Sequence, residues 1–514
     1  MSNRSNRNLL PGCAGCMKPC APVKAGISRR TLFSAGAAAI GAGAASSRAA
    51  FGADPDRQQP ILQKLKVQPV LQYQIYQRKQ ATSWRSWGGL LNEQMVRDEE
   101  ARIKGELAKM SAAAGFPLEI LPLESVRTKE EAVKVAAGGH DVTLVYAASG
   151  DAGTLEALST KPWTIHFVRH RSGPVYLWYE IAHPRMLRKM ADEFGQKNMD
   201  VNDVVVDSYA DIQMRLRALH GLKNTLGKKV VCIGKPSGWG QGGKIAPEKS
   251  KEIFNLDLVS VPYEELSPRM QKARANDALV ARTRKLADDY LRAKGVKLET
   301  SREFVQKSFL LREVFQDLLD EHKTDALTIY SCMGTIMGIS ETTACLPLSL
   351  LNDDGYMAFC ESDFVVIPSG ILLRYVSGLP MFLNDPTYPH HGVVTLAHCT
   401  APRRMDGKNA EPVRLLTHFE SDYGAAPKVE MRKGQMTTNL IPDFAFKKWV
   451  GFEGEIVDVP FLPICRSQID VAVKGDLNKL LEEMKGFHWM TSYGAFVAES
   501  AYALRKVGIE VIKI

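Results

Sequence analysis

The amino-acid sequence predicts a layered α/β protein, and three observations lead to this fold class. Strand-like and helix-like patterns alternate along the chain after about residue 66, which is typical of α/β folds. The composition, with 45% hydrophobic and 24% charged residues, is that of folded soluble protein and excludes disordered, collagen-like and disulfide-scaffold chains. The length of 514 residues allows about two to four domains of about 100 to 200 residues each.

The first α/β unit is expected over residues 66–226, after a polar linker at 54–65. Residues 67–75 form an apolar run that predicts a strand, and residues 92–114 combine helical spacing with many good helix formers. The cycle then repeats, with strands expected at 118–123, 141–146 and 163–168 and helices at 128–137 and 153–158.

A second α/β unit is expected over residues 227–339. Its strands are expected at 228–234, 258–261 and 325–330, and its charged helices at 269–294 and 301–322. The loop Ser237–Gly243 follows a strand, but it lacks the lysine of a phosphate-binding loop and the glycine spacing of a dinucleotide site. We therefore expect a mobile active-site loop there and no nucleotide site.

The segment 340–514 carries the candidate chemistry. Two apolar runs, 356–361 and 379–385, end in the acidic residues Glu361 and Asp385. α/β proteins commonly place ligand groups at the carboxyl ends of buried strands. Because the two acids are 24 residues apart, adjacent strand ends would have to bring them together. The alternative is that each acid is an ordinary cap or turn residue.

A candidate histidine, His488, follows an amphipathic helix expected at 475–485 and its Gly486 cap. Two carboxylates with a histidine would suit Mn²⁺ or Mg²⁺ and would leave coordination positions open for a polyol. A lone histidine among apolar residues is, however, usually a satisfied core side chain. The residues alone leave both interpretations open.

The nine cysteines fall into two groups. Three near the N-terminus are spaced closely enough to hold a metal, but they lack a fourth ligand and lie in a segment expected to be removed: Cys13, Cys16 and Cys20. The other six form no CxxC pair, so we expect buried free thiols, typical of a protein that folds in a reducing compartment: Cys232, Cys332, Cys345, Cys360, Cys399 and Cys465.

Residues 1–53 predict an export signal of the twin-arginine (Tat) type. The motif Ser28–Phe33 contains the paired arginines, and the uncharged, small-residue stretch Thr31–Ser47 accompanies it. That stretch has 17 residues, fewer than the about 20 apolar ones that a membrane-spanning helix needs. We expect cleavage near Ala49–Ala53, export by the Tat translocase to a periplasmic or other extracytoplasmic location, and no permanent membrane span.

The net charge is concentrated in the same N-terminal segment. Residues 1–53 hold seven basic and no acidic residues, and removing seven from the total of 66 leaves 59 basic against 57 acidic residues. The lysines and arginines of this nearly neutral body are interleaved with acids, unlike the basic stripe of a nucleic-acid-binding protein. No nucleic-acid partner is therefore expected.

A series of short motifs runs through the last third of the chain. The segment PLSLLNDDG at 347–355 leads into CESD at 360–363, and further motifs follow in order at 378–382, 384–386, 398–402, 465–468, 486–488 and 493–494. Together these motifs resemble the signature of the L-fucose isomerase and L-arabinose isomerase superfamily. The resemblance is specific across about residues 325–514 and only topological across 66–324.

The resemblance implies a metal site and an architecture. In the fucose branch a divalent metal, usually Mn²⁺ but also Mg²⁺ or Co²⁺, would be bound by Glu361, Asp385 and His488. The arabinose branch uses two glutamates and two histidines, so Asp385 points to the fucose side, and His398 is the fourth-ligand candidate on the other interpretation. The implied fold is two Rossmann-like N-terminal α/β units followed by a mixed, β-rich C-terminal domain at 340–514, in a homo-oligomer.

The resemblance also implies the reaction, the interconversion of an aldose and a ketose. The metal would hold the O1 and O2 oxygens of the open-chain sugar and polarise its carbonyl group. Glu361 and Asp385 would move a proton between C2 and C1 through a cis-enediol, and either could be the base. The alternative is an exported sugar-binding or non-isomerising relative that keeps the fold and the ligands.

Two groups of residues are candidates for contact with the sugar. The loop after the first strand carries two tryptophans and an arginine that could line a sugar site: Trp84, Arg85 and Trp87. Trp489 is the second candidate, because it directly follows His488. Ordinary packing of these side chains is the alternative in both cases.

Overall fold

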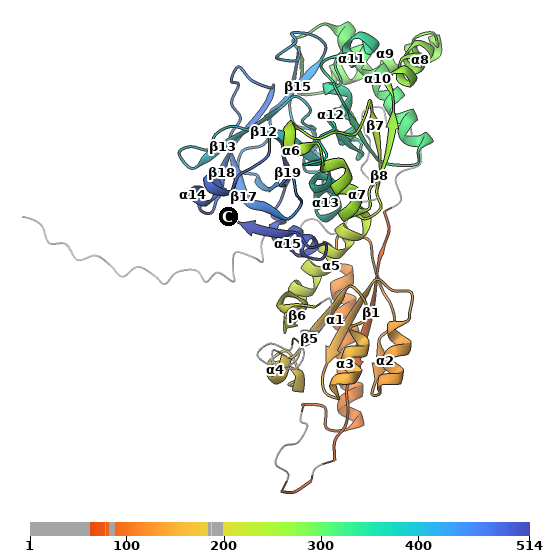
Figure 1. Cartoon of the computed structure of the whole chain (residues 1–514), viewed down its shortest axis with the longest axis vertical. Helices are drawn as coiled ribbons and strands as arrows, with labels where there is room; N and C mark the ends of the chain where they lie inside the picture. The colour runs from red at the N-terminus through yellow and green to blue at the C-terminus, as the bar shows by residue number, and fades with distance from the viewer. Residues whose placement is uncertain (1–61, 78, 82–87, 183–186, 188–198) are drawn as a thin grey trace, which may run out of the picture. The chain divides into compact units, whose positions relative to one another are not determined.

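The computed structural model describes residues 62–77, 79–81, 88–182, 187 and 199–514 of the chain, which form an α/β protein (Figure 1). The expected export signal, the three N-terminal cysteines, most of the linker and the loop candidates Trp84, Arg85 and Trp87 lie outside the described residues. Among the helices of the described part, none combines the length and the apolar character that crossing a membrane requires.

The first sheet is parallel and has the strand order β2-β1-β4-β5-β6, with β3 also paired to β1. Its strands are β1 (Leu65–Gln72), β2 (Leu118–Ile120), β3 (Glu124–Val126), β4 (Val142–Ala147), β5 (Thr164–Val168) and β6 (Val204–Val206). Its helices are α1 (Glu93–Ala112), α2 (Lys129–Ala136), α3 (Ala152–Leu158), α4 (Leu177–Ile181) and α5 (Tyr209–Thr225), with the 3-10 turn η2 at Val201–Asp203. Every residue of β4 and β5 is buried, as expected for parallel strands that helices cover on both faces.

The elements predicted for this unit are present, with one strand divided in two. Asn92 begins α1 by accepting a hydrogen bond from the Met95 N–H, and Thr128 begins α2 with a capping box. The strand expected at 118–123 is divided between β2 and β3. Pro122 lies in the break, where a residue without a backbone N–H cannot join the ladder.

The second sheet is also parallel, with the order β11-β10-β7-β8. Its strands are β7 (Lys229–Ile233), β8 (Asp257–Val261), β10 (Ala326–Ile329) and β11 (Met357–Phe359). Around it lie α6 (Gly240–Gly243), α7 (Ala246–Phe254), α8 (Tyr263–Arg274), α9 (Asp277–Arg292), α10 (Arg302–Glu321), α11 (Thr335–Ser340), α12 (Cys345–Asp353) and α13 (Ile367–Ser377).

Alternate residues of β7 enter two separate hydrophobic cores. Val230 and Cys232 belong to the core that α5 and α13 share, whereas Val231 and Ile233 pack with residues of α8, α10 and α12. This is the two-residue period of a strand that has helices on both sides. The second sheet is therefore a doubly covered α/β layer, as the sequence predicts.

Two details of the second unit differ from the sequence-based expectation. The single helix expected at 269–294 is two helices, α8 and α9, because the Asn276 side chain caps a new helix by accepting a hydrogen bond from the Leu279 N–H. The strand β11 pairs with β10, so the second sheet continues beyond the boundary expected at residue 339. The second unit thus extends past residue 339, at least to the end of β11 at Phe359.

The C-terminal segment contains a closed barrel (Figure 1, blue). Six antiparallel strands follow one another in the order β16-β19-β12-β13-β18-β17, and β17 pairs back to β16. They are β12 (Met381–Pro386), β13 (Val393–His398), β16 (Met436–Ile441), β17 (Lys448–Asp458), β18 (Ser467–Lys474) and β19 (Trp489–Tyr493). The expected α/β fold class, with two parallel units and a β-rich C-terminal part, is confirmed.

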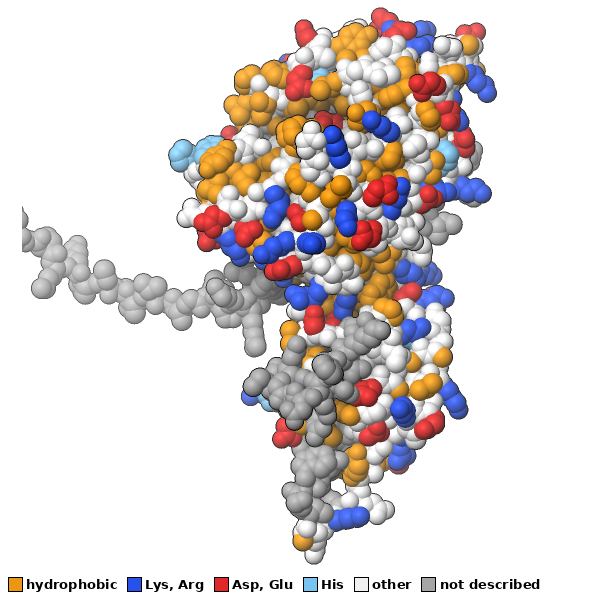
Figure 2. All heavy atoms as spheres, viewed as in Figure 1, with side chains coloured by type: hydrophobic (Ala, Val, Ile, Leu, Met, Phe, Trp, Pro, Cys, Tyr) orange, Lys and Arg blue, Asp and Glu red, His pale blue; other side chains and the backbone are white. Residues whose placement is uncertain are grey.

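Smaller elements complete this part. A three-stranded sheet joins β9 (Val296–Leu298) to β14 (Val413–Leu416) and β15 (Ala426–Val429). The strand β20 (Glu510–Lys513) runs parallel to β17, and the helices are α14 (Leu477–Glu483) and α15 (Val497–Arg505). Basic and acidic side chains are interleaved over the face seen in Figure 2.

Candidate metal centre

Strand register brings three of the candidate residues together. In the barrel, Asn384 of β12 is paired with Trp489 of β19, so the next residue along β12, Asp385, lies beside the residue that precedes β19, His488. Asp385 is also paired with Ala397 of β13, whose neighbour is His398. Glu361 comes from the second sheet, two residues after the end of β11.

Glu361 lies on a turn with an unusual backbone. Glu361 and Ser362 both have left-handed backbone conformations, with φ of 62° and 50°. The Ser362 N–H donates to Oγ1 of Thr328 on the neighbouring strand β10, at 3.1 Å, which helps to hold the turn. Left-handed conformations are costly for residues other than glycine and are concentrated at functional sites. The turn therefore holds the Glu361 carboxylate in a defined place.

The side chains converge on one small region. The Nε2 atom of His488 lies 3.5 Å from the Glu361 carboxylate and 3.3 Å from Oδ1 of Asp385. The Nε2 atom of His398 lies 3.8 Å from the other Glu361 oxygen. Both histidines are buried, whereas about a quarter of each carboxylate side chain, 28% for Glu361 and 26% for Asp385, is exposed. Solvent or a small substrate can thus reach the carboxylates but not the back of the rings.

Each histidine ring is oriented by its other nitrogen. Nδ1 of His488 lies 2.7 Å from Oδ2 of the buried Asp363, and Nδ1 of His398 lies 2.8 Å from Oγ1 of Thr400. The Asp363 carboxylate is itself fixed, because its other oxygen accepts the backbone N–H groups of Trp239 and Val365. Metal-bound histidines commonly have such a partner on the far nitrogen, since it fixes the ring and its tautomer.

The electrostatics favour positive charge at this position. Burial opposes a charge on His488, but contacts with Asp363 and Glu361 raise its pKa to about 10. Burial raises the pKa of Asp385 to about 6. Burial would also raise the pKa of Glu361, yet the two histidine rings hold it well below its usual range. Two neighbouring carboxyl groups with pKa values shifted in opposite directions are typical of acid–base pairs.

The donor set fits a divalent cation. The side-chain atoms of Glu361, His398 and His488 form a group compact enough to hold a metal ion. Among the described residues, Nε2 of His488 and Oδ1 of Asp385 are buried without a hydrogen-bond partner, although both face the region where the carboxylates and imidazoles meet. A cation there would satisfy both atoms, and oxygen and imidazole donors suit manganese and related metals.

The expectation for Trp489 is wrong. Its side chain is fully buried in the barrel core, where its ring packs edge-on against Phe452 and its Nε1–H donates to the Lys485 carbonyl oxygen. Successive residues of an extended chain point to opposite faces, so Trp489 points to the face opposite that of the ligand candidate His488. Trp489 supports the barrel and offers no surface to a sugar.

Two other aromatic residues lie beside the site. Trp239, in the loop after β7, stacks on Phe487 with ring centroids 3.9 Å apart and an interplanar angle of 8°. Phe487 directly precedes His488, and the Trp239 N–H donates to Asp363. Both rings remain partly exposed, Trp239 by 47% and Phe487 by 39%. The sequence gives one signal for them, namely their positions next to a glycine-rich loop and next to a ligand candidate.

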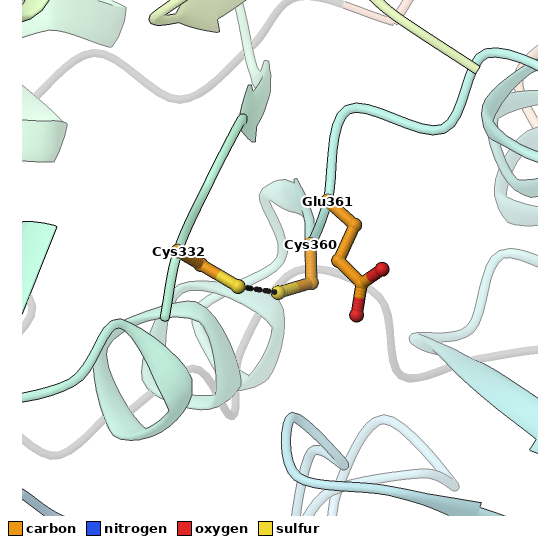
Figure 3. Close-up of side chains that lie close together, drawn as sticks. All are labelled: Cys332, Cys360 and Glu361. Atoms are coloured by element: carbon orange, nitrogen blue, oxygen red, sulfur yellow. Dashed lines mark hydrogen bonds between the residues drawn. The ribbon is translucent and has the colours of Figure 1, made fainter. Parts of the chain in front are cut away.

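Cysteines also surround the centre. All six cysteines of the described part are free, as predicted, but only four of them are buried, since Cys332 and Cys465 are partly exposed. Cys360 directly precedes Glu361, and its Sγ lies 3.3 Å from Sγ of Cys332, which follows β10 (Figure 3). Cys399 follows His398 and packs with Cys345 and Cys465. Thiols are therefore neighbours of two of the candidate ligands.

No protein-family model matches the chain, and no curated protein sequence matches it either. The function proposed below therefore depends on the geometry of this centre and on the motifs quoted above.

Proposed function

We propose that the protein is a divalent-metal-dependent isomerase that interconverts an aldose and a ketose. The observation that carries the proposal is the convergence of Glu361, Asp385 and His488 from two different sheets, with Nε2 of His488 lying 3.5 Å from the Glu361 carboxylate and 3.3 Å from Oδ1 of Asp385. The motif resemblance to L-fucose isomerases supports the same three residues as ligands.

The residues suggest how the reaction would proceed. A bound Mn²⁺, Mg²⁺ or Co²⁺ would act as a Lewis acid on the oxygens of the open-chain sugar. Glu361 and Asp385 present partly exposed carboxylates within reach of one another across His488, so the pair can take a proton from C2 and return it at C1. Asp363 holds the His488 ring in place through Nδ1 while this happens.

The stacked pair Trp239 and Phe487 supports a carbohydrate substrate. Flat aromatic faces suit the apolar C–H surfaces of sugars, and these two rings are partly exposed, with the Phe487 ring centroid 4.8 Å from that of His488. The two rings would give the centre an apolar wall beside the polar wall that its carboxylates and histidines form. An open-chain aldose of five or six carbons, such as L-fucose or D-arabinose, has both kinds of surface.

The test is ketose formation by the purified protein from a panel of aldoses, with Mn²⁺, Mg²⁺ or Co²⁺ and after removal of metal with a chelator. We expect metal-dependent turnover, with exchange of the C2 hydrogen with solvent deuterium seen by NMR. Glu361→Gln and Asp385→Asn should each lower the rate by about 10² to 10⁴-fold, the usual size of a lost acid–base contribution.

Glu453→Gln is the matched control, because Glu453 is a half-buried glutamate of β17 that interacts with the Val497 backbone and Lys513, not with the candidate ligands. Its rate should equal that of the wild type. A Glu361 or Asp385 variant that keeps more than about a tenth of the rate would contradict the assignment of the proton shuttle. Sugar binding with bound metal but without turnover would instead favour a binding protein.

A further inference from the structure

The pair Cys332 and Cys360 has no role in the proposed reaction, yet it lies next to a candidate ligand. The strands β10 and β11 are parallel neighbours, with Thr328 paired to Phe359, so both cysteines come just after the carboxyl ends of adjacent strands. Their sulfur atoms are 3.3 Å apart and turned toward one another, and an oxygen of the Glu361 carboxylate lies within 4.8 Å of both (Figure 3).

The sulfur–sulfur distance is compatible with a metal site, since Cys332, Cys360 and Glu361 form a compact donor group, as well as with a disulfide, so the other donors nearby have to decide between them. Two sulfurs on a tetrahedral zinc, at about 2.3 Å each, would be about 3.8 Å apart. The nearest further donor is Glu361, whose two oxygens face the histidines, at 3.8 Å from His398 and 3.5 Å from His488. A disulfide needs a sulfur–sulfur distance of about 2.05 Å, so an approach of roughly 1.3 Å would form one.

The two thiols differ in access. Cys360 is buried, with 3% of its surface exposed, and packs in the core beneath the second sheet. Cys332 is half-buried on a loop whose neighbours Ser331 and Met333 are exposed. An oxidant can therefore reach Cys332 first, and Cys360 is placed to resolve the product. This is the arrangement of an attacking and a resolving thiol.

We propose that Cys332 and Cys360 form a reversible disulfide that controls the position of Glu361. With hydrogen peroxide as the oxidant, the Cys332 sulfur attacks one peroxide oxygen, the O–O bond breaks, and water leaves a sulfenic acid. The Cys360 sulfur then attacks the Cys332 sulfur, the S–O bond breaks, and a second water leaves. The two thiols supply the two electrons and both protons, and a dithiol reductant reverses the change.

The effect on the centre follows from chain connectivity, and this part of the inference rests on the proposed function. Cys360 is bonded directly to Glu361, whose left-handed turn leaves little freedom to compensate for a displacement of its neighbour. Closing the disulfide pulls Cys360 toward β10 and moves Glu361 from the histidines. Metal affinity therefore falls on oxidation, and by linkage bound metal must oppose disulfide formation by the same factor.

The first test maps the disulfide in the full chain and needs no enzyme activity. The reduced protein is treated with hydrogen peroxide, alkylated, and cleaved after acidic residues, since Glu341 and Asp354 separate the three nearby cysteines into different peptides. We expect peptides 326–341 and 355–361 to be linked, and dithiothreitol to release them. Cys332→Ser and Cys360→Ser abolish the link, whereas the matched control Cys345→Ser keeps it.

The second test measures Mn²⁺ affinity by calorimetry for the reduced and oxidised wild type and for Cys332→Ser. Oxidation should weaken binding in the wild type by about 5- to 150-fold, the range of typical coupling energies, and leave the variant unchanged. If the two peptides never become linked, the disulfide is overturned. The disulfide is also overturned if the reduced protein retains zinc and Cys332→Ser loses it. Equal affinities in both redox states would overturn the coupling. A protein that binds no Mn²⁺ when reduced would defeat the proposed function, while the peptide map would still decide the disulfide.

Discussion

The Nδ1 atom of His488 lies 2.7 Å from Oδ2 of Asp363, two residues after Glu361 on the same turn. One short segment of the second sheet thus carries both a candidate ligand and the group that orients another ligand from the barrel. Removing either residue disturbs the same centre in a different way, and the two effects can be measured separately.

Replacing Asp363 by asparagine should lower Mn²⁺ affinity by about 10- to 100-fold, because the ring of His488 loses the carboxylate that fixes its orientation and tautomer. Calorimetric titration with Mn²⁺ measures the change. Asp470→Asn is the control, since Asp470 also accepts a short hydrogen bond, from Thr395 on the barrel wall, but does not contact either histidine. Equal affinities for the two variants would mean that Asp363 does not support a ligand.

Replacing Trp239 or Phe487 by alanine should raise KM for the sugar about tenfold with a smaller effect on kcat, because the stacked rings bind substrate and transition state alike. The loss of sugar-binding free energy in the double variant should be smaller than the sum of the losses in the two single variants, since each ring supports the other. Steady-state kinetics on each variant supply the numbers. Phe461→Ala, an equally exposed aromatic residue under Arg414, should behave as wild type. A drop in kcat alone would argue against a substrate-binding wall.

Acid should weaken the first sheet through His166. This residue of β5 is fully buried, and burial lowers its pKa to about 3. The unfolded chain, with a histidine pKa of about 6.5, binds a proton that the folded state excludes, so this contribution is lost as the pH falls below 6.5. Between pH 7 and pH 5 the loss is about 2 kcal/mol.

Urea unfolding at both pH values tests this. The variant His166→Gln keeps a polar atom near Ser159. Between pH 7 and pH 5 its free energy of unfolding should fall by about 2 kcal/mol less than that of the wild type. His390→Gln, which changes an exposed histidine, should not alter the pH dependence. If the free energy of unfolding falls by the same amount between pH 7 and pH 5 in the wild type and in His166→Gln, His166 is excluded as the source of the acid sensitivity.

Two glycine-to-alanine changes should move stability in opposite directions. A Cβ at Gly221 of α5 would lie 2.4 Å from Cγ2 of Val376 on α13, so Gly221→Ala should destabilise by about 1 to 3 kcal/mol. Gly105 of α1 has open space around it, so Gly105→Ala should stabilise by about 0.5 to 1 kcal/mol through helix propensity. Urea midpoints give both values, and shifts of the same sign would refute the packing argument.

The helices and strands that the sequence predicts well have a clear repeat in the spacing of their apolar residues. The helix α1 and the strands β4 and β7 agree with expectation to within a residue or two at most ends, because their apolar spacing and caps are local signals. The helices α12 and α13 were not predicted. Nearly all of their residues are buried, so no polar face marks the helical repeat.

The candidate site was predictable only in part. Glu361, Asp385 and His488 could be named as candidates because strands that end in acids and a histidine after a helix are sequence patterns, and because the motifs around them resemble those of the isomerase superfamily. Asp363 could not, since its role depends on the ring that lies 125 positions away in the chain. The expectation for Trp489 rests on its position beside His488, whereas strand alternation places its side chain on the other face.

The centre joins two structures whose strands belong to separate sheets. Glu361 belongs to the parallel sheet, whereas Asp385 and His488 belong to the barrel. A cation bound by all three residues therefore cross-links the sheet to the barrel. Local unfolding of either the sheet or the barrel breaks this cross-link. Bound metal therefore raises the free energy of local unfolding of both structures. Hydrogen exchange in β11 and in β19 should therefore slow by a similar factor on metal addition, turning two separately opening regions into one cooperative unit.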